Sequence, residues 1–429
     1  MTGQSLPSEV GISSTTLRRA PLTSRRFWLA LAIVASGIAA VQLPRAFLAY
    51  FHVWPPRITN GHVDLDRRWQ EVQYVFHGEN PYDVLFANSA RARSVEPPEQ
   101  TSVGRFATVD PGLGLPDGVD YPPWAFTTEA LFVWLPSRQS QEFFYSVLMC
   151  VGLAIVFVWV YHQLKNESPL AAYAVGMAAL AAASWVTSIV VGNFPPVLLP
   201  LLIACHTLLN SRKDVAAGLV LGVAMLKPTV AGPFFLVLLV KRRWAAAAVC
   251  AAWVCATSAV TWALTHTDPL HMLVQMFVAS KLWIGDGFGP AQYLMSAGVP
   301  PFSATATTAV AFLLLGLYCL WLLRDRSMLA LFSIAAITSR FWSYHMYYDD
   351  AFMLFALVFL AREIFASGQR IAMLAFCLAC LALWVPHHIA LIPALQILQL
   401  CTWLLLAFVV LRLSLVPSAE QRELQVSLA

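Results

Sequence analysis

Apolar segments dominate this chain, and most of them are long enough to be membrane helices. A run of about 20 apolar residues can span the hydrocarbon core of a bilayer as a helix. The runs lie at about 27–50, 141–162, 170–191, 194–210, 244–265, 302–323, 328–339, 351–361, 371–385 and 393–411. Shorter apolar pieces lie at 124–135, 215–226 and 229–240. Because lipid offers the backbone no hydrogen-bond partners, the pattern predicts an all-α, polytopic membrane bundle of about ten to thirteen helices, some short or re-entrant.

A polar stretch follows the first apolar run and opens a long loop, 52–123. Its apolar residues at helical spacing are Leu65, Trp69, Val72 and Phe76. This periodicity predicts an amphipathic helix over 64–77 that lies on the bilayer surface. Asp64 stands at the N-cap position, and Gly78 stands where such a helix ends.

Composition and charge narrow the classes of partner. The chain is 59% hydrophobic and 12% charged, whereas soluble domains carry about 25% charged residues. The net charge of +4 is spread over short loops, so the chain has no basic patch of the kind that binds nucleic acid. The eight cysteines lie inside apolar runs, where packing is their simplest role. Membrane lipid is therefore the expected surrounding, and no nucleic acid is expected as a partner.

Basic residues in short loops mark the cytoplasmic side of membrane proteins. The basic clusters are Arg18 to Arg26, Arg212-Lys213, Lys241 to Arg243, Arg324 with Arg326, Arg362 with Arg370, and Arg412. They predict cytoplasmic tails at 1–26 and 414–429 around a membrane domain at 27–413. The front half fits this topology only if one segment is re-entrant or one basic cluster lies outside. The best candidate is 215–240, which would form a hairpin with Lys227 at its tip.

Several charged residues lie where lipid alone does not explain them, and such residues are candidates for function. Lys227 could bind a phosphate, or it could snorkel or cap carbonyl groups freed by Pro228. Arg340, His345 and Asp349 lie in one aromatic stretch and could grip a phosphate, or could join two helices through an Arg–Asp pair. Asp64 could be a general base or only an N-cap. Asp66 could assist it or only suit the helix dipole.

In order and spacing, the polar motifs resemble those of GT-C glycosyltransferases, and within that fold those of family 87, the polyprenol-phosphate-mannose-dependent mannosyltransferases. The motifs are Asp64 with Gly78-Glu79-Asn80-Pro81-Tyr82, Tyr121-Pro122-Pro123, Gly192-Asn193, Gly218 and Gly222 with Lys227-Pro228, and Tyr344-His345 with Tyr348-Asp349. Gly192-Asn193 departs from the family's Gly-Gln-x-Asn, because the Gln is replaced and the Asn is shifted.

The resemblance implies a polyprenyl-phosphate sugar donor, with mannose as the expected sugar, and a glycan or glycolipid acceptor. It also implies inversion at the anomeric carbon and an active site on the extracytoplasmic side of the plasma (inner) membrane. Asp64 and Asp66 are the expected catalytic residues, and Lys227, Arg340 and His345 the expected donor-phosphate ligands. The expected substrate-binding residues are Tyr82, Tyr121, Asn193, Tyr348 and Asp349. No metal or other cofactor is expected, although the two aspartates could hold a divalent ion.

Two alternatives stay open. A related enzyme could use another polyprenyl-phosphate sugar, such as arabinose or glucose. A transporter or flippase of lipid-linked sugars would also suit broken helices around a buried lysine, but it predicts internal repeats, which the sequence lacks, and has no need of a long loop after the first span.

Overall fold

The computed structural model describes residues 25–51, 63–87, 121–280, 289–343, 345–386, 389 and 392–415. Among them every regular element is helical, which confirms the all-α prediction. The expected tails and most of the 52–123 loop lie outside the described residues. The elements are α1 (Arg25–Tyr50), α2 (Val63–Phe76), α4 (Pro123–Glu129), α5 (Arg138–Leu164), α6 (Pro169–Leu180), α7 (Ser184–Val191), α8 (Pro195–Asn210), α9 (Asp214–Ala224), α10 (Pro228–Val240), α11 (Trp244–Thr265), α12 (Pro269–Ser280), α13 (Pro290–Ser296), α14 (Pro301–Leu322), α15 (Met328–Trp342), the 3-10 helix η2 (Tyr347–Met353), α16 (Leu354–Ser367), α17 (Arg370–Trp384) and α19 (Pro393–Leu415).

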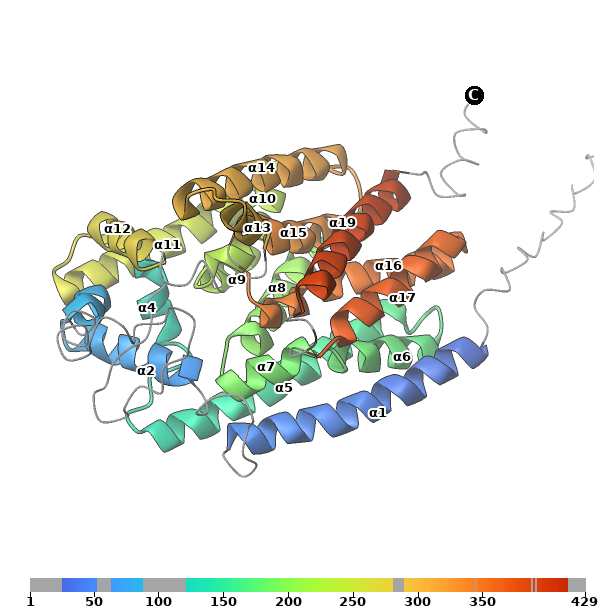
Figure 1. The fold of residues 1–429 in the computed structure, drawn as a ribbon, viewed down its shortest axis with the longest axis horizontal. Coiled ribbons are helices and arrows are strands. Elements are labelled where there is room, and N and C mark those ends of the chain that lie inside the picture. Colours follow the sequence, from blue (N-terminus) through green and yellow to red (C-terminus); the bar gives the residue numbers. More distant parts are fainter. Residues whose placement is uncertain are drawn as a thin grey trace, which may run out of the picture.

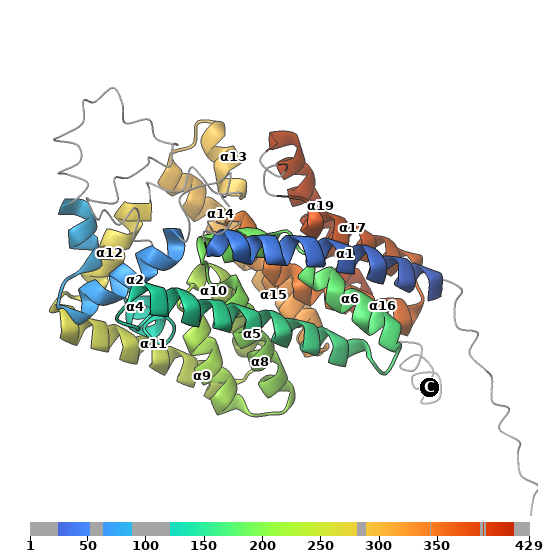
Figure 2. The same ribbon diagram turned by 90° about the horizontal axis from the view of Figure 1, so that it is seen from below.

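The described helices form an elongated bundle (Figure 1). Within the described part of the chain, five helices are long and apolar enough to cross a membrane: α1, α5, α11, α14 and α19. The bent pair α6–α7 would make a sixth, and several further apolar helices are shorter. The chain is therefore a multi-pass membrane protein. The start of α1 and the end of α19 lie toward one end of the bundle, and α2, α4 and α12 gather at the other (Figures 1 and 2).

Several of the basic loops meet one another, as the charge pattern predicts for loops on one side. The Lys241 ammonium after α10 donates to the Arg326 carbonyl before α15 at 2.9 Å. The Arg326 guanidinium in turn donates to the Leu415 carbonyl at the end of α19 at 3.1 Å. Arg243, before α11, pairs with Asp214 at the start of α9 at 3.2 Å. Three connections and the end of α19 thus share one basic end of the bundle.

The Arg243–Asp214 pair also defines the shape of α9 and α10. Asp214 begins α9 and Arg243 follows α10, so the pair brings the two ends of this segment together. The helices are interrupted at Lys227, directly before Pro228, which lacks the N–H that a continuous helix would use. The predicted hairpin with Lys227 at its tip is confirmed.

The predicted apolar segment 170–191 is not one continuous helix, because the chain breaks between α6 and α7 with a bend of 49°. The backbone groups at the break find partners outside the helix. The Trp185 indole donates to the Ala179 carbonyl at 2.8 Å, and the Ala183 N–H donates to the Leu383 carbonyl of α17 at 2.8 Å. These two hydrogen bonds stabilise a break that the alanine-rich sequence does not predict.

Helix α2 begins within one residue of the prediction, but its buried face is different. Leu65 and Val72 are buried as expected, whereas Phe76 is exposed. Arg68 and Glu71 are buried instead, as an ion pair of 2.7 Å. The helix packs against α4 and α11, so protein rather than lipid covers this face. Gly78 ends the helix with a positive φ of 84°, as predicted.

Close packing of α9 on α11 depends on Gly218. A Cβ at this position would lie 2.3 Å from the Ala246 carbonyl oxygen, a backbone atom that cannot move alone. We expect Gly218→Ala to lower the free energy of unfolding by about 1–3 kcal/mol, despite the better helix propensity of alanine. Thermal and denaturant unfolding in detergent would measure the loss. Gly37→Ala in α1 is the matched control, since nothing lies within 4 Å of its added Cβ; an equal loss in both variants would contradict the packing argument.

Candidate active site

Four segments that are distant in sequence meet beside α2. They are the start of α2 with Asp64, the α7–α8 turn with Asn193, the hairpin tip with Lys227, and η2 with Asp349. Helix α7 contacts both α2 and η2, and α8 also contacts η2. The fold therefore brings together residues from four of the predicted motifs.

A chain of polar contacts joins these residues. The Asn193 Nδ2 donates to Asp64 Oδ2 at 2.6 Å. The Lys227 Nζ lies 3.4 Å from Asn193 Oδ1 and 2.5 Å from Asp349 Oδ1. The same ammonium stands over the Tyr348 ring, 4.7 Å from its centroid. Acid, amide, cation and second acid thus alternate along one connected path.

The path of polar contacts from Asp64 to Asp349 has an accessible end and an enclosed end. The Asp64 side chain keeps 19% of its exposure, while that of Asp349 keeps 3%. Lys227 is buried, and its ammonium binds Asp349 rather than reaching the surface, so snorkelling does not explain it. The arrangement presents a carboxylate to an incoming molecule with a buried cation behind it.

Asp350 is the centre of a second buried cluster. Its Oδ1 pairs with Arg340 Nε at 2.8 Å and lies 2.9 Å from His345 Nε2. Its Oδ2 accepts from Gln399 Nε2 of α19 at 2.9 Å. Two of the predicted phosphate ligands, Arg340 and His345, are therefore held by one carboxylate next to Asp349. Both are almost fully buried.

Asp66 points to a different partner from Asp64. Its Oδ2 accepts from Arg138 at the start of α5 at 2.7 Å, and Arg138 also binds Glu142 at 3.0 Å. The Arg138 side chain is 52% exposed, so this is a surface pair. The two aspartates predicted as catalytic thus lie on one helix but in different surroundings.

Tyr82 and Tyr121, predicted to bind substrate, contact each other in the core. The Tyr82 hydroxyl donates to the Tyr121 carbonyl, and the Arg68 guanidinium stacks 4.0 Å from the centroid of the Tyr121 ring. The turn before Tyr82 is fixed by the Asn80 amide, which donates to Gln275 of α12 at 2.8 Å. This motif therefore attaches the loop after α2 to α12 and α4.

The sequence reading missed four polar residues of this region: Asp350, Gln399, Arg68 and Glu71. Asp350 had a detectable signal, since it is a second acid directly after Asp349 in an aromatic stretch. The sequence also contains a signal for Arg68 and Glu71, because opposite charges three residues apart can pair on a helix. Gln399 had none, because its partner is 49 residues away.

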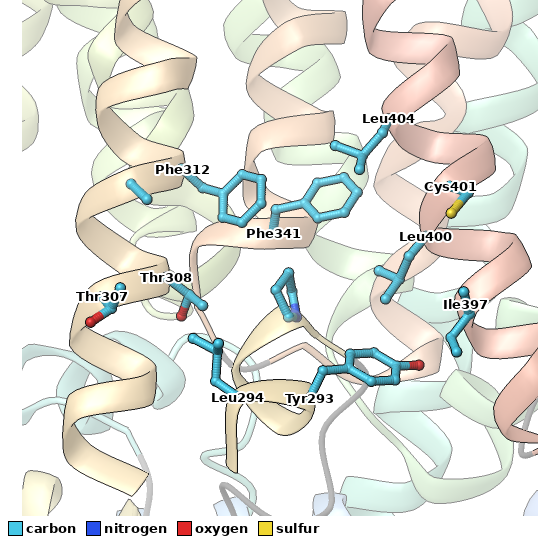
Figure 3. A pocket seen from close by; sticks show the side chains of 12 residues that line it. Tyr293, Leu294, Thr307, Thr308, Phe312, Phe341, Ile397, Leu400, Cys401 and Leu404 are labelled. Atoms are coloured by element: carbon cyan, nitrogen blue, oxygen red, sulfur yellow. The ribbon is translucent and has the colours of Figure 1, made fainter. Parts of the chain in front are cut away.

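An apolar pocket of about 570 Å³ lies between α13, α14, α15 and α19 (Figure 3). Its lining is almost wholly apolar and includes the stacked rings of Phe312 and Phe341, 5.1 Å apart. Ile397 and Leu404 line it yet remain 49% and 44% exposed, so the pocket opens outward.

The pocket also lies near the Asp350 cluster. Phe341 directly follows Arg340 in α15. Burial raises the pKa of the Tyr293 hydroxyl, and the positive charge of Arg340 opposes this shift, so the two side chains are within electrostatic reach. The apolar pocket and the Asp350 cluster are therefore neighbours in the fold.

Metal binding was not expected, and that expectation stays a prediction. Within the described ranges, no three His, Cys, Asp or Glu side chains gather as metal ligands would. Asp64 and Asp66 lie beside different partners, Asn193 and Arg138, so the possibility that both hold one ion gains no support from their contacts.

Comparison with known proteins agrees with the motif pattern. No curated protein matches the chain at a significant level. The sequence model of glycosyltransferase family 87 matches residues 120–346, which include Asn193, Lys227 and Arg340 and make up more than half of the chain. Asp64 and Asp349 lie outside the matched residues, but the match covers more than half of this multi-pass bundle. The chain therefore belongs to glycosyltransferase family 87 and is a membrane glycosyltransferase.

Proposed function

We propose that this glycosyltransferase moves a hexose, mannose first among the candidates, from a polyprenyl-phosphate donor to a glycan or glycolipid acceptor, with inversion at the anomeric carbon. The observation that carries the proposal is the Asp64 carboxylate, partly exposed and joined through Asn193 to a buried lysine. A sugar transfer of this kind needs both a base and a cation, because a proton and a phosphate must leave.

In the proposed mechanism, Asp64 removes the proton of the acceptor hydroxyl as that oxygen attacks the anomeric carbon. The bond from the anomeric carbon to the phosphate oxygen breaks, and the polyprenyl phosphate leaves with increased negative charge. Lys227, Arg340 and His345 stabilise this charge. Attack opposite the leaving group in one step gives inversion.

The apolar pocket supports a lipid donor. Its lining is apolar, and it opens between exposed apolar side chains of α19. Arg340 acts electrostatically on Tyr293, which lines the pocket. We propose that the first isoprenoid units lie in this pocket and that the rest of the tail continues into the bilayer. A nucleotide sugar has no comparable apolar part.

The basic end of the bundle supports a proposal for the side of the membrane on which the site opens. Loops rich in Lys and Arg face the cytoplasm, and Asp214 and Lys241 are at that end whereas Lys227 is at the opposite end of the hairpin. We propose that the protein resides in the plasma (inner) membrane and that the site opens to the extracytoplasmic side. Because the chain belongs to a glycosyltransferase family, we do not propose a transporter. Arabinose and glucose remain alternatives to mannose as the transferred sugar.

The test is sugar transfer by the purified protein in lipid vesicles. Radiolabelled mannose, glucose and arabinose on polyprenyl phosphate would each be offered with a panel of mannosides and glycolipids, beside the corresponding nucleotide sugars. We expect product only from a polyprenyl-phosphate donor, and most from mannose. Product from a nucleotide sugar alone would overturn the lipid-donor proposal. Product only from another lipid-linked sugar would overturn the choice of mannose.

A further inference from the structure

Asn193 is held more tightly than a residue that only contacts substrate needs to be. It follows Gly192, whose φ of 70° ends α7 in the left-handed conformation. A Cβ at Gly192 would lie 2.6 Å from the Leu65 Cβ, so only glycine lets this turn approach the start of α2 so closely. The backbone of Asn193 is fixed as well, since its N–H donates to Ser188 at 2.9 Å and its carbonyl accepts from Tyr145 at 3.0 Å.

The orientation of the Asn193 amide is determined by its neighbours. Its Oδ1 accepts from the Phe194 N–H at 2.8 Å and faces the Lys227 ammonium at 3.4 Å. Both groups are donors only, so the amide oxygen must be on this side. The amide NH₂ therefore points at Asp64 Oδ2, at 2.6 Å.

This geometry assigns the two Asp64 oxygens different tasks. The hydrogen bond that Asn193 donates to Oδ2 fixes the rotation of the carboxylate. The other oxygen, Oδ1, has Arg67 at 3.8 Å and belongs to a side chain that is still partly exposed. A base needs this arrangement, with one oxygen held and the other directed toward the acceptor hydroxyl.

On the basis of the proposed function, we infer that Asn193 is a positioning residue that orients the catalytic carboxylate and joins it to the lysine of the donor site. It acts through Asp64 and does not itself bind the sugar. The Lys227–Asp349 pair fixes the other side of the amide. The single Asn193 carboxamide thus sets the distance between the base and the cation that receives the leaving phosphate.

The charged and titratable groups around this contact come from four elements. Arg67 lies on α2 itself, Tyr145 on α5, Lys227 at the hairpin tip and Asp349 on η2. Lys227 and Tyr145 also contact Asn193 itself, so a substitution at position 193 affects their surroundings too. Comparison of Asn193→Asp with Asp64→Asn/Asn193→Asp isolates the contact with Asp64, because both variants carry the same carboxylate beside Lys227.

The first measurement needs no substrate. In Asn193→Asp two carboxylates would meet at the 2.6 Å contact, so they must share a proton or repel. We expect the Tm of this variant to fall at pH 8 and to recover toward the wild-type value at pH 5. The exchanged variant Asp64→Asn/Asn193→Asp restores one donor and one acceptor, and we expect it to recover stability at pH 8 but not activity.

The second measurement is the pH–rate profile with the lipid-linked donor. We expect Asn193→Ala to lower kcat about 10- to 100-fold with a donor KM within about two-fold, the scale for losing a group that orients a functional one. We expect the acidic limb of the Asn193→Asp profile to move upward by at least about one pH unit, because the shared proton must leave before the base can act. Asn210→Asp makes the same chemical change on α8, at the far end of the helix beside His206, and should match the wild type.

Three results would overturn the inference. The first is an unchanged kcat in Asn193→Ala. The second is a raised acceptor KM with kcat retained, which would make Asn193 a substrate contact. The third is an Asn193→Asp variant whose Tm and pH–rate profile follow those of the wild type. If the wild type uses no lipid-phosphate donor, both the proposed function and the positioning role are wrong. If the wild type is active but positions 64 and 193 show no coupling, only the positioning role is wrong.

Discussion

Asp64→Asn is expected to reduce sugar transfer about 10²- to 10⁴-fold in kcat, the contribution of a positioned general base. Asparagine keeps the shape of the side chain and an oxygen that can accept the bond from Asn193, so the variant should fold and bind donor like the wild type. Single-turnover rates with saturating polyprenyl-phosphate donor, beside a donor-binding measurement, would separate chemistry from binding.

The same measurement on Asp66→Asn discriminates between the two aspartates. Asp66 forms a surface pair with Arg138, and such pairs contribute about 0–1 kcal/mol. We expect its kcat to stay within about three-fold of wild type. A large loss in Asp66→Asn with little loss in Asp64→Asn would assign the base to Asp66 and return Asp64 to a structural role at the start of α2.

Lys227→Met is expected to cost the protein both stability and activity. The Lys227–Asp349 pair is 2.5 Å long and almost fully enclosed. Removal of one partner from a buried pair leaves the other charge uncompensated, at a cost of about 3–5 kcal/mol. Unfolding in detergent would measure this loss, and donor binding should fall because the cation of the phosphate site is gone.

A double variant separates the two effects of Lys227. In Lys227→Met/Asp349→Leu no buried charge remains from the pair, so we expect most of the stability to return while transfer stays absent. Arg138→Met is the control for stability, because its 2.7 Å pair with Asp66 is exposed and should cost under about 1 kcal/mol. Recovery of transfer in the double variant would contradict a role for Lys227 in donor use.

Where the sequence predicted the structure well, the signal was local. The apolar spacing from Leu65 to Val72 and the glycine at 78 located α2, because a helix and its stop depend on neighbouring residues. Pro228 located the interruption between α9 and α10 for the same reason, since a proline removes one backbone donor wherever it stands. Charge in the short loops identified the ends that meet at Asp214 and Arg243.

The sequence predicted less where a partner is distant in the chain. The break between α6 and α7 depends on the carbonyl of Leu383, about 200 residues later, and an alanine-rich segment alone favours a continuous helix. The burial of Arg68 and Glu71 depends on α4 and α11, which cover a face that periodicity assigned to lipid. Asn193 was identified as a site residue, but its orientation by Phe194 and Lys227 is visible only in three dimensions.

The bond from Gln399 to Asp350 has a consequence for biosynthesis. A ribosome delivers Asp64, Asn193 and Lys227 before α19, and N-terminal parts of a chain fold before C-terminal parts. The Asp350 cluster acquires its Gln399 contact only after α19 has entered the membrane. A nascent chain that stalls before residue 393 would therefore contain Asp64, Asn193 and Lys227 but lack the contact that Gln399 makes with Asp350, the partner of Arg340 and His345. The order of synthesis thus delays the assembly of the site until α19 has joined the bundle.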